Sequence, residues 1–347
     1  MGFNRCNETI YPQENHVNPN APPQPRTGEG HLRRVGVEIE FAAIAPGKAA
    51  QLVIDHFGGQ AVAISPHRFK VAGTRWGEFT VELDAKYAHP DAKVVKKTEA
   101  KHDEWNHWRL ELHNRTRQLI GDAVAVVVPT EIVCPPLPWL ALNELDALFN
   151  ALRLQGARDT RDSLLYAFGL HLNPEVPGTD AATLLAHLRA YLILAEWLRE
   201  EIDIDITRDV LPHANPFPKE YALKVLDPDY DPDLDTLIAD YLIDNPTRNR
   251  ELDMFPLFAH LRPDYPSELL TGSLVKPRPT FHYRLPNAQL SQPGWNAVCE
   301  WNRWVEVERL AADPKRLAER GEAYIDHHRR SPVTRWLDRL KEWMHDA

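Results

Sequence analysis

Cysteine is scarce in this sequence, which has only three among its 347 residues. Cys6, Cys134 and Cys299 lie far apart, and none of them is part of a Cys-x-x-Cys pair. This spacing gives no sign of a disulfide framework or of a zinc site. The chain is nevertheless long enough for one large domain or two ordinary ones. With 43% hydrophobic residues, it can build a sizeable core.

Long apolar runs are also scarce in the sequence. By inspection, no stretch approaches the length that spans a membrane, and the N-terminus lacks the basic-then-apolar order of a signal peptide. We therefore expect a cytoplasmic protein with no membrane partner. The formal net charge of −10 argues against general nucleic-acid binding. A local basic cleft could still hold phosphates.

The common sequence signatures of nucleotide and hydrolase sites are missing as well. The chain has no P-loop, no Gly-x-Gly-x-x-Gly, no His-Glu-x-x-His and no Gly-x-Ser-x-Gly pattern. If the protein uses ATP, it must therefore hold the nucleotide in a different architecture.

The most informative stretch that is present runs from Gly36 to Phe41, where glutamates alternate with apolar residues. A strand here would place Glu38 and Glu40 on one face and the apolar side chains on the other. Two adjacent carboxylates repel each other, and a divalent cation would relieve that repulsion. The alternative is the solvated face of an ordinary antiparallel strand. Recurrence of the pattern in later segments favours a metal site.

Later segments repeat this alternation and add polar groups to the same predicted face. Residues Glu78 to Asp84 place Glu82 and Asp84 together. Glu82 is a candidate metal ligand, and its alternative is a cross-strand ion pair with Lys or Arg. Carboxylates with one imidazole suit Mg²⁺ or Mn²⁺, because oxygen ligands predominate and Mn²⁺ tolerates nitrogen. The other predicted polar groups are Glu131 after the strand-like run Ala123–Val128, His171 and Asn173 in a strand over Ser163–Asn173, and Arg284 in a last strand over Pro279–Asn287.

Helical periodicity separates these strand-like segments. A helix should begin near Asp180, a plausible cap, and run to about Glu201. Strands with one polar face, alternating with helices, predict an α+β fold whose sheet is antiparallel or mixed, with helices on its apolar face. Residues 1–30 are polar and rich in proline, so we expect a disordered tail. Further helices are predicted at about 98–120, 139–154 and 233–243, and two amphipathic helices within 291–347 should pack on the domain, the last with Ser331 as its cap.

The ordered set of motifs resembles a known family. The motifs are Gly-Val-Glu-Ile-Glu-Phe from residue 36, Trp-x5-Glu-x-Asp from Trp76, Glu-Ile-Val-x-Pro-Pro from Glu131, and Gly-Leu-His-x-Asn from Gly169. In this order they resemble the amidoligases, part of the carboxylate–amine ligase superfamily that includes glutamine synthetase and glutamate–cysteine ligase. The resemblance covers roughly residues 33–290. It implies a glutamine synthetase-like catalytic domain over about residues 31–290.

The resemblance also implies roles for individual residues. Glu38, Glu40 and Glu131 match metal ligands, and His171 matches the metal-binding histidine of a Gly-x-His-x-His pattern. This chain departs at the second histidine, where Asn173 can form hydrogen bonds near the nucleotide phosphates but cannot carry charge. Three further residues have looser matches: Arg284 resembles a late-strand arginine that contacts phosphate, with Arg248 and Arg250 as rivals.

The family implies an ATP- and Mg²⁺- or Mn²⁺-dependent ligase. A carboxylate, from a small molecule or a peptide, would be phosphorylated by ATP, and an amine would attack the acyl phosphate to form an amide. Asp84 is a candidate acceptor for the amine proton. Two alternatives are a phosphotransferase of the same fold and a non-catalytic binding protein that retains the sheet. The apolar stripe of the last predicted helix leaves a homo-oligomer open, and the sequence names neither substrate.

Overall fold

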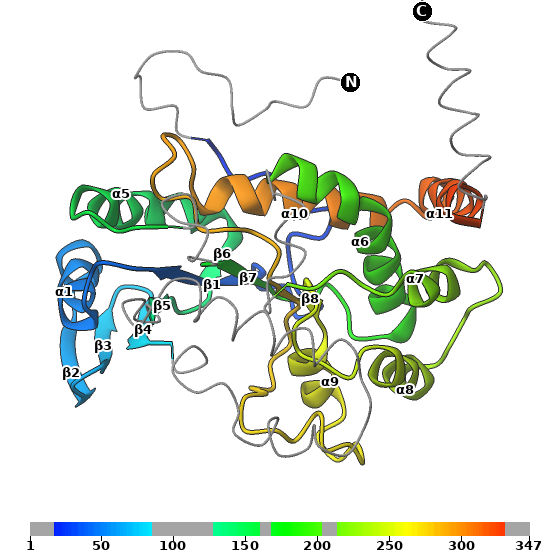
Figure 1. Ribbon diagram of the computed structural model, residues 1–347, viewed down its shortest axis with the longest axis horizontal. Coiled ribbons are helices and arrows are strands. Elements are labelled where there is room, and N and C mark those ends of the chain that lie inside the picture. Colours follow the sequence, from blue (N-terminus) through cyan, green and yellow to red (C-terminus); the bar gives the residue numbers. More distant parts are fainter. Residues whose placement is uncertain (1–16, 85–127, 160–167, 203–213, 330–347) are drawn as a thin grey trace, which may run out of the picture.

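The core of the structure, a computed structural model, is a nine-stranded antiparallel sheet. The structure describes residues 17–84, 128–159, 168–202 and 214–329. The strand order is β2-β3-β4-β5-β1-β7-β9-β8, and the short β6 pairs with β1 (Figure 1). The predicted α+β class is therefore confirmed. The strands are β1 (Arg34–Phe41), β2 (Gln60–Ser65), β3 (Arg68–Thr74), β4 (Gly77–Leu83), β5 (Thr130–Val133), β6 (Leu137–Pro138), β7 (Leu170–Pro174), β8 (Leu252–Asp253) and β9 (His282–Tyr283).

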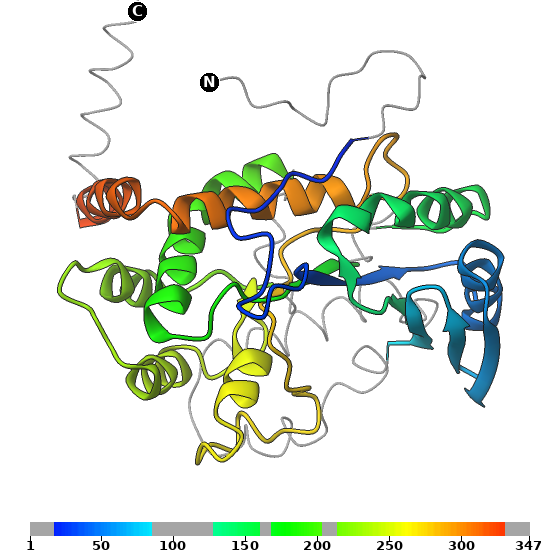
Figure 2. The same cartoon turned by 180° about the vertical axis from the view of Figure 1, so that it is seen from behind.

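Helices cover one face of this sheet. In Figures 1 and 2, α5, α10 and α6 lie along the same side of the central strands. The helix α1 packs against β3 and β4, and α10 packs against both α6 and β7. The polar side chains of the central strands lie on the face opposite this layer. The helices are α1 (Pro46–Phe57), α5 (Asp146–Leu154), α6 (Ala181–Glu201), α7 (Lys219–Leu226), α8 (Leu234–Asp244), α9 (Phe255–Leu261), α10 (Ala297–Ala311) and α11 (Pro314–Arg329), with a 3-10 helix, η2, at Trp139–Leu145.

The two faces of the central strands differ as the alternation predicts. Val37, Ile39 and Phe41 of β1 are fully buried beneath the helices, and so are Ile132, Leu170 and Leu172 of the neighbouring strands. Burial of such side chains supplies the main driving force for folding of the domain. The strand register places Glu40 opposite Glu131 and Glu38 opposite His171 on the other face. The prediction that these polar groups share one face is confirmed.

The helix α6 corrects one sequence-based expectation. By length and composition alone, Ala181–Glu201 is apolar enough to cross a membrane, although the sequence was expected to hold no such run. In the structure, 56% of the most apolar 18-residue window of α6 is buried inside the protein. The core helix of a soluble protein, which is mostly buried, passes the same test of length and composition. The predicted cap is confirmed, because Asp180 Oδ1 accepts a hydrogen bond of 2.9 Å from the Thr183 N–H.

Several predicted elements have different bounds in the structure. The helix expected at 139–154 begins as the 3-10 turn η2 before α5 continues it. The helix expected at 233–243 is confirmed as α8. Of the strand expected over Pro279–Asn287, only β9 is a strand, since prolines at both ends cannot donate to the sheet. The helix α7 is not among the helices that the sequence predicts. The expected helices at 98–120 and from Ser331, the run Ala123–Val128 and the first part of Ser163–Asn173 lie outside the described residues.

Residues 17–30, which were expected to be part of a disordered tail, pack on the domain. The Trp301 indole N–H donates to the Asn20 carbonyl oxygen at 2.9 Å, and the Trp139 indole N–H donates to the Pro25 carbonyl oxygen at 3.2 Å. These bonds join the segment to α10 and η2. The disordered-tail prediction is therefore wrong for residues 17–30, because backbone carbonyls, which composition does not reveal, make its contacts. Residues 1–16 lie outside the described part of the chain.

Candidate active site

Three glutamates form a row across the polar face of the sheet. Glu40 of β1 lies opposite Glu131 of β5, which in turn lies opposite Glu82 of β4. Glu40 and Glu131 are buried. Glu82 is partly exposed, and its Oε2 forms an ion pair of 3.0 Å with Arg68 Nε. The cross-strand ion pair, the alternative for Glu82, is thus observed, and the buried end of the row is the better place for a cation.

His171 of β7 completes a group of potential metal ligands at that buried end. One ligand atom each from Glu40, Glu131 and His171 lies within 4.8 Å of the others. The Gly169 N–H donates to Glu40 Oε2 at 3.0 Å, which fixes the carboxylate beside the histidine. Two carboxylates and one imidazole make a donor set that Mg²⁺ or Mn²⁺ can use. We call these three residues the cation group.

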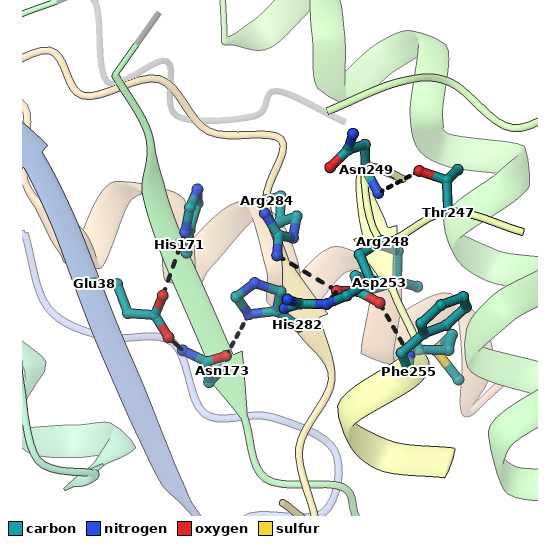
Figure 3. Close-up of polar contacts among 12 residues, drawn as sticks. Glu38, His171, Asn173, Thr247, Arg248, Asn249, Asp253, Phe255, His282 and Arg284 are labelled. Atoms are coloured by element: carbon teal, nitrogen blue, oxygen red, sulfur yellow. Dashed lines mark hydrogen bonds and ion pairs between the residues drawn. The ribbon is translucent and has the colours of Figure 1, made fainter. Parts of the chain in front are cut away.

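The ring of His171 is oriented by its two neighbours. Its Nδ1 lies 3.4 Å from Glu38 Oε2 (Figure 3). On the other side, a Cβ added to Gly169 would lie 2.6 Å from His171 Nε2. The imidazole therefore fills the space beside Gly169. A carboxylate behind a metal-binding histidine commonly fixes the ring in this way, so we place Glu38 behind His171.

Substitution of Gly169 should test this orientation. In Gly169→Ala, the new methyl group must displace the His171 ring, and we expect Mn²⁺ affinity to fall about 10- to 100-fold. Isothermal titration calorimetry measures the change. Gly47→Ala is the matched control, because its Cβ would meet only Phe69, at an ordinary contact distance of 3.4 Å. Equal Mn²⁺ affinity in both variants would contradict the placement of Nε2 toward the cation group.

A second group, next to the first, contains Glu38, His171 and His282. Asn173 connects its members, because Asn173 Nδ2 donates to Glu38 Oε1 at 2.9 Å and Asn173 Oδ1 lies 2.6 Å from His282 Nδ1 (Figure 3). Arg278 Nη2 donates to the same amide oxygen at 2.6 Å. Asn173 thus uses both ends of its side chain to connect β1, β9 and the loop that carries Arg278.

The charge states of this second group follow from its burial and its neighbours. Burial alone would raise the pKa of Glu38, but the hydrogen bond with His171 and the charge of Arg278 hold that pKa well below its usual range. Burial and the nearby Arg284 hold the pKa of His282 well below its ordinary value. At neutral pH, Glu38 is therefore ionised and His282 is neutral.

Arginines gather around Asp253 at the other end of the polar face. Arg284 Nη2 lies 3.4 Å from Asp253 Oδ2, and Arg248 Nε lies 3.5 Å from the same oxygen (Figure 3). Burial raises the pKa of Asp253, although the charges of Arg284 and Arg248 oppose that shift. The Nε atoms of Arg248, Arg278 and Arg284 are buried and make no hydrogen bond within the described residues. Such donors suit the oxygens of a bound anion.

The order of these groups along the chain points to one family. Two glutamates in β1, a glutamate in β5, a histidine in β7 and an arginine after β9 meet on one face. Over residues 31–306, the chain matches the family described as "Putative amidoligase enzyme". The chain belongs to this amidoligase family. No curated protein and no solved structure matches the chain.

Membership shows the protein to be an enzyme of ligase type. The matched segment contains every candidate residue of the polar face, from β1 to Arg284, and extends into α10. The amidoligase match therefore includes the helix that covers the apolar face, and not only the strands that carry the site.

Two residues that the sequence suggested lie apart from these groups. Arg250 Nη1 donates to the Pro216 carbonyl oxygen, and its guanidinium lies 5.9 Å from the centroid of the Phe217 ring. The structure therefore does not bring Arg250 to the arginines around Asp253. Asp84 is buried just after β4, where its backbone N–H donates to the Pro129 carbonyl oxygen at 2.9 Å. It lies two residues beyond Glu82 in the chain.

Sequence reasoning did not select three residues of the candidate site. His282 lies two residues before Arg284, so strand alternation could have identified it. Asp253 pairs with His282 across β8 and β9, and only that pairing places it on the polar face. Arg278 lies in a loop, and no local pattern distinguishes it from other surface arginines.

Proposed function

We propose that this amidoligase is an ATP- and divalent-metal-dependent carboxylate–amine ligase with a glutamine synthetase-like catalytic domain. One observation carries the proposal: a single buried sheet face places carboxylates and an imidazole next to a cluster of arginines. The first set suits a hard cation and the second suits phosphate oxygens. A metal-bound nucleotide needs both within one site.

The residues fit a divalent ion by their donor chemistry. The cation group would hold it, because Glu40, Glu131 and His171 offer two oxygens and one nitrogen within 4.8 Å. When bound, the ion would neutralise charge on the phosphates of ATP. Glu38 would keep the His171 ring in place from behind. Of the ligands that the sequence suggests, Glu82 would be the outer member of the row, where it pairs with Arg68.

The arginines would act on the transferred phosphoryl group. A carboxylate oxygen of the substrate attacks the γ-phosphorus of ATP, the bond from that phosphorus to the β-phosphate oxygen breaks, and ADP leaves. Arg284 and Arg248 would donate hydrogen bonds to the oxygens that gain charge in this step. Asp253 would hold both arginines in place, since it lies within 3.5 Å of each.

The second step forms the amide. The amine nitrogen attacks the carbon of the acyl phosphate, inorganic phosphate leaves, and the nitrogen loses a proton. We propose Asp84 as the acceptor of that proton, because it continues the polar face beyond Glu82. Asn173, which the sequence places near the nucleotide phosphates, would act as a positioning residue that holds Glu38 and Arg278 by hydrogen bonds.

The test is ADP release from Mg-ATP across a panel of amino acids, short peptides and polyamines, with mass spectrometry of the products. We expect ADP and phosphate only when both a carboxylate and an amine are present, with one amide formed per ADP. Without the amine, the acyl phosphate should form and leak slowly to water.

Other outcomes would contradict the ligase proposal. ADP formation with an accumulating phosphorylated product and no amide would identify a phosphotransferase. Absence of nucleotide binding at millimolar Mg-ATP would leave a binding protein that retains the sheet. A Glu131→Gln variant serves as the control, since loss of a proposed ligand should abolish ADP release by either the ligase or the phosphotransferase route.

A further inference from the structure

One guanidinium nitrogen of Arg278 lies close to Glu38 and His282 of the second candidate metal group, and to Asn173, which connects them. Arg278 Nη2 is 2.6 Å from Asn173 Oδ1, 2.8 Å from His282 Nδ1 and 3.4 Å from Glu38 Oε1. A guanidinium stays protonated at all ordinary pH values and has no lone pair to accept a hydrogen bond. A fixed positive charge therefore already lies against the atoms that a second metal ion would need.

The hydrogen bonds around Arg278 also determine which atoms of His282 are available. Arg278 Nη2, which can only donate, lies 2.8 Å from His282 Nδ1, and Asn173 Oδ1, which can only accept, lies 2.6 Å from the same nitrogen. In either tautomer of the ring, Nδ1 therefore forms a hydrogen bond with one of these two groups. This nitrogen of His282 is not open to a metal ion while Arg278 is in place.

His171 independently limits the number of ions. It belongs to both candidate groups, but its Nδ1 faces Glu38 and only its Nε2 points toward Gly169 and Glu40. A neutral imidazole offers one lone pair, so it can serve one ion. With Nδ1–H donating to Glu38, that lone pair is on the side of the cation group.

We propose that the guanidinium of Arg278 takes the place of a second metal ion between Glu38 and His282, so that the protein without nucleotide binds one divalent cation. This inference rests on the proposed function, which requires a divalent ion at the cation group. It adds that Arg278 determines how many metal ions the site binds. Asn173 supports it, because an amide can donate to Glu38 and accept from Arg278 at the same time.

The experiment counts Mn²⁺ ions bound per chain at saturation without nucleotide, by equilibrium dialysis with electron paramagnetic resonance of free Mn²⁺. The wild-type chain should bind one. Arg278→Ala should bind two, because removal of the guanidinium frees Glu38 and His282. Arg278→Ala combined with Glu38→Gln should return to one. Arg262→Ala is the matched control and should bind one, since Arg262 forms an exposed ion pair with Asp235.

Arg278→Gln gives a second version of the test if the alanine variant does not fold. It retains an amide that can hydrogen bond to Asn173 but removes the charge, and it should also bind two ions. Two ions in the wild-type chain, or one ion in both Arg278 variants, would overturn the inference and leave the proposed function standing. No bound Mn²⁺ in the wild-type chain would instead contradict the metal site of the proposed function itself.

Discussion

Replacement of Arg33 by alanine should lower the free energy of unfolding by about 3–5 kcal/mol. Arg33 and Glu308 form a bidentate ion pair, with both N···O distances 2.7 Å and side chains only 1% and 2% exposed. Arg33 also donates to the carbonyl oxygens of Gln24 and Glu175. Removal of the guanidinium leaves the Glu308 carboxylate buried. Among the described residues, the Trp304 indole N–H is then its remaining side-chain donor, at 2.8 Å. Urea denaturation followed by circular dichroism measures the loss.

An exposed arginine on the same helix as Glu308 provides the control. Arg309 pairs with Glu306 one turn away, and its side chain is 46% exposed. Arg309→Ala should change the free energy of unfolding by at most about 0.5 kcal/mol, because surface pairs contribute little. The double variant Arg33→Met, Glu308→Leu should be more stable than Arg33→Met alone, since it removes the unpaired charge. A loss in Arg33→Ala no larger than that in Arg309→Ala would contradict the assignment.

Arg284→Ala should lower kcat of the ligase reaction by about 10²- to 10³-fold and change KM for ATP much less. The expected pattern follows from the proposed role, in which Arg284 donates to charge that develops on the phosphoryl group during transfer. Steady-state ADP release with the substrate pair found in the panel gives both constants.

Arg250→Ala is the matched control for Arg284→Ala. Arg284 is buried and Arg250 is partly buried, but Arg250 contacts the Pro216 carbonyl oxygen and the Phe217 ring instead of Asp253. We expect this variant to lose stability and to keep kcat near the wild-type value. Equal losses of kcat in the two variants would show that the effect of Arg284 is structural. A rise in KM for ATP with unchanged kcat would show that Arg284 acts in ground-state binding of ATP and not in phosphoryl transfer.

Local alternation predicted the part of the site that regular strands carry. In β1 the side chains must alternate between faces, so Val37 and Ile39 beneath the helices fixed Glu38 and Glu40 on the polar side. The same rule placed Glu131 and His171, because each lies in a strand paired to β1. The face of a strand residue is a local property, and the sequence was sufficient to predict it.

Contacts between distant segments account for what the sequence did not predict. Arg278 and Asn173 are 105 residues apart in the sequence. They can form a hydrogen bond because β7 pairs with β9, and Arg278 lies in the loop just before β9. Asp253 reaches the site only through the pairing of β8 with β9. The sequence failed to predict the order of residues 17–30 for a related reason. Its composition predicts disorder, whereas its backbone carbonyls accept hydrogen bonds from Trp139 and Trp301.

The central claim is that the buried carboxylates and the arginines of one sheet face bind a metal and the phosphates of one nucleotide. Anomalous diffraction at the manganese edge, from crystals grown with Mn²⁺ and a non-hydrolysable ATP analogue, tests it most directly. We predict a manganese peak bound by Glu40, Glu131 and His171, with the γ-phosphate between that ion and Arg284. A manganese peak bound to other side chains, or a triphosphate that lies away from Arg284, would contradict the claim.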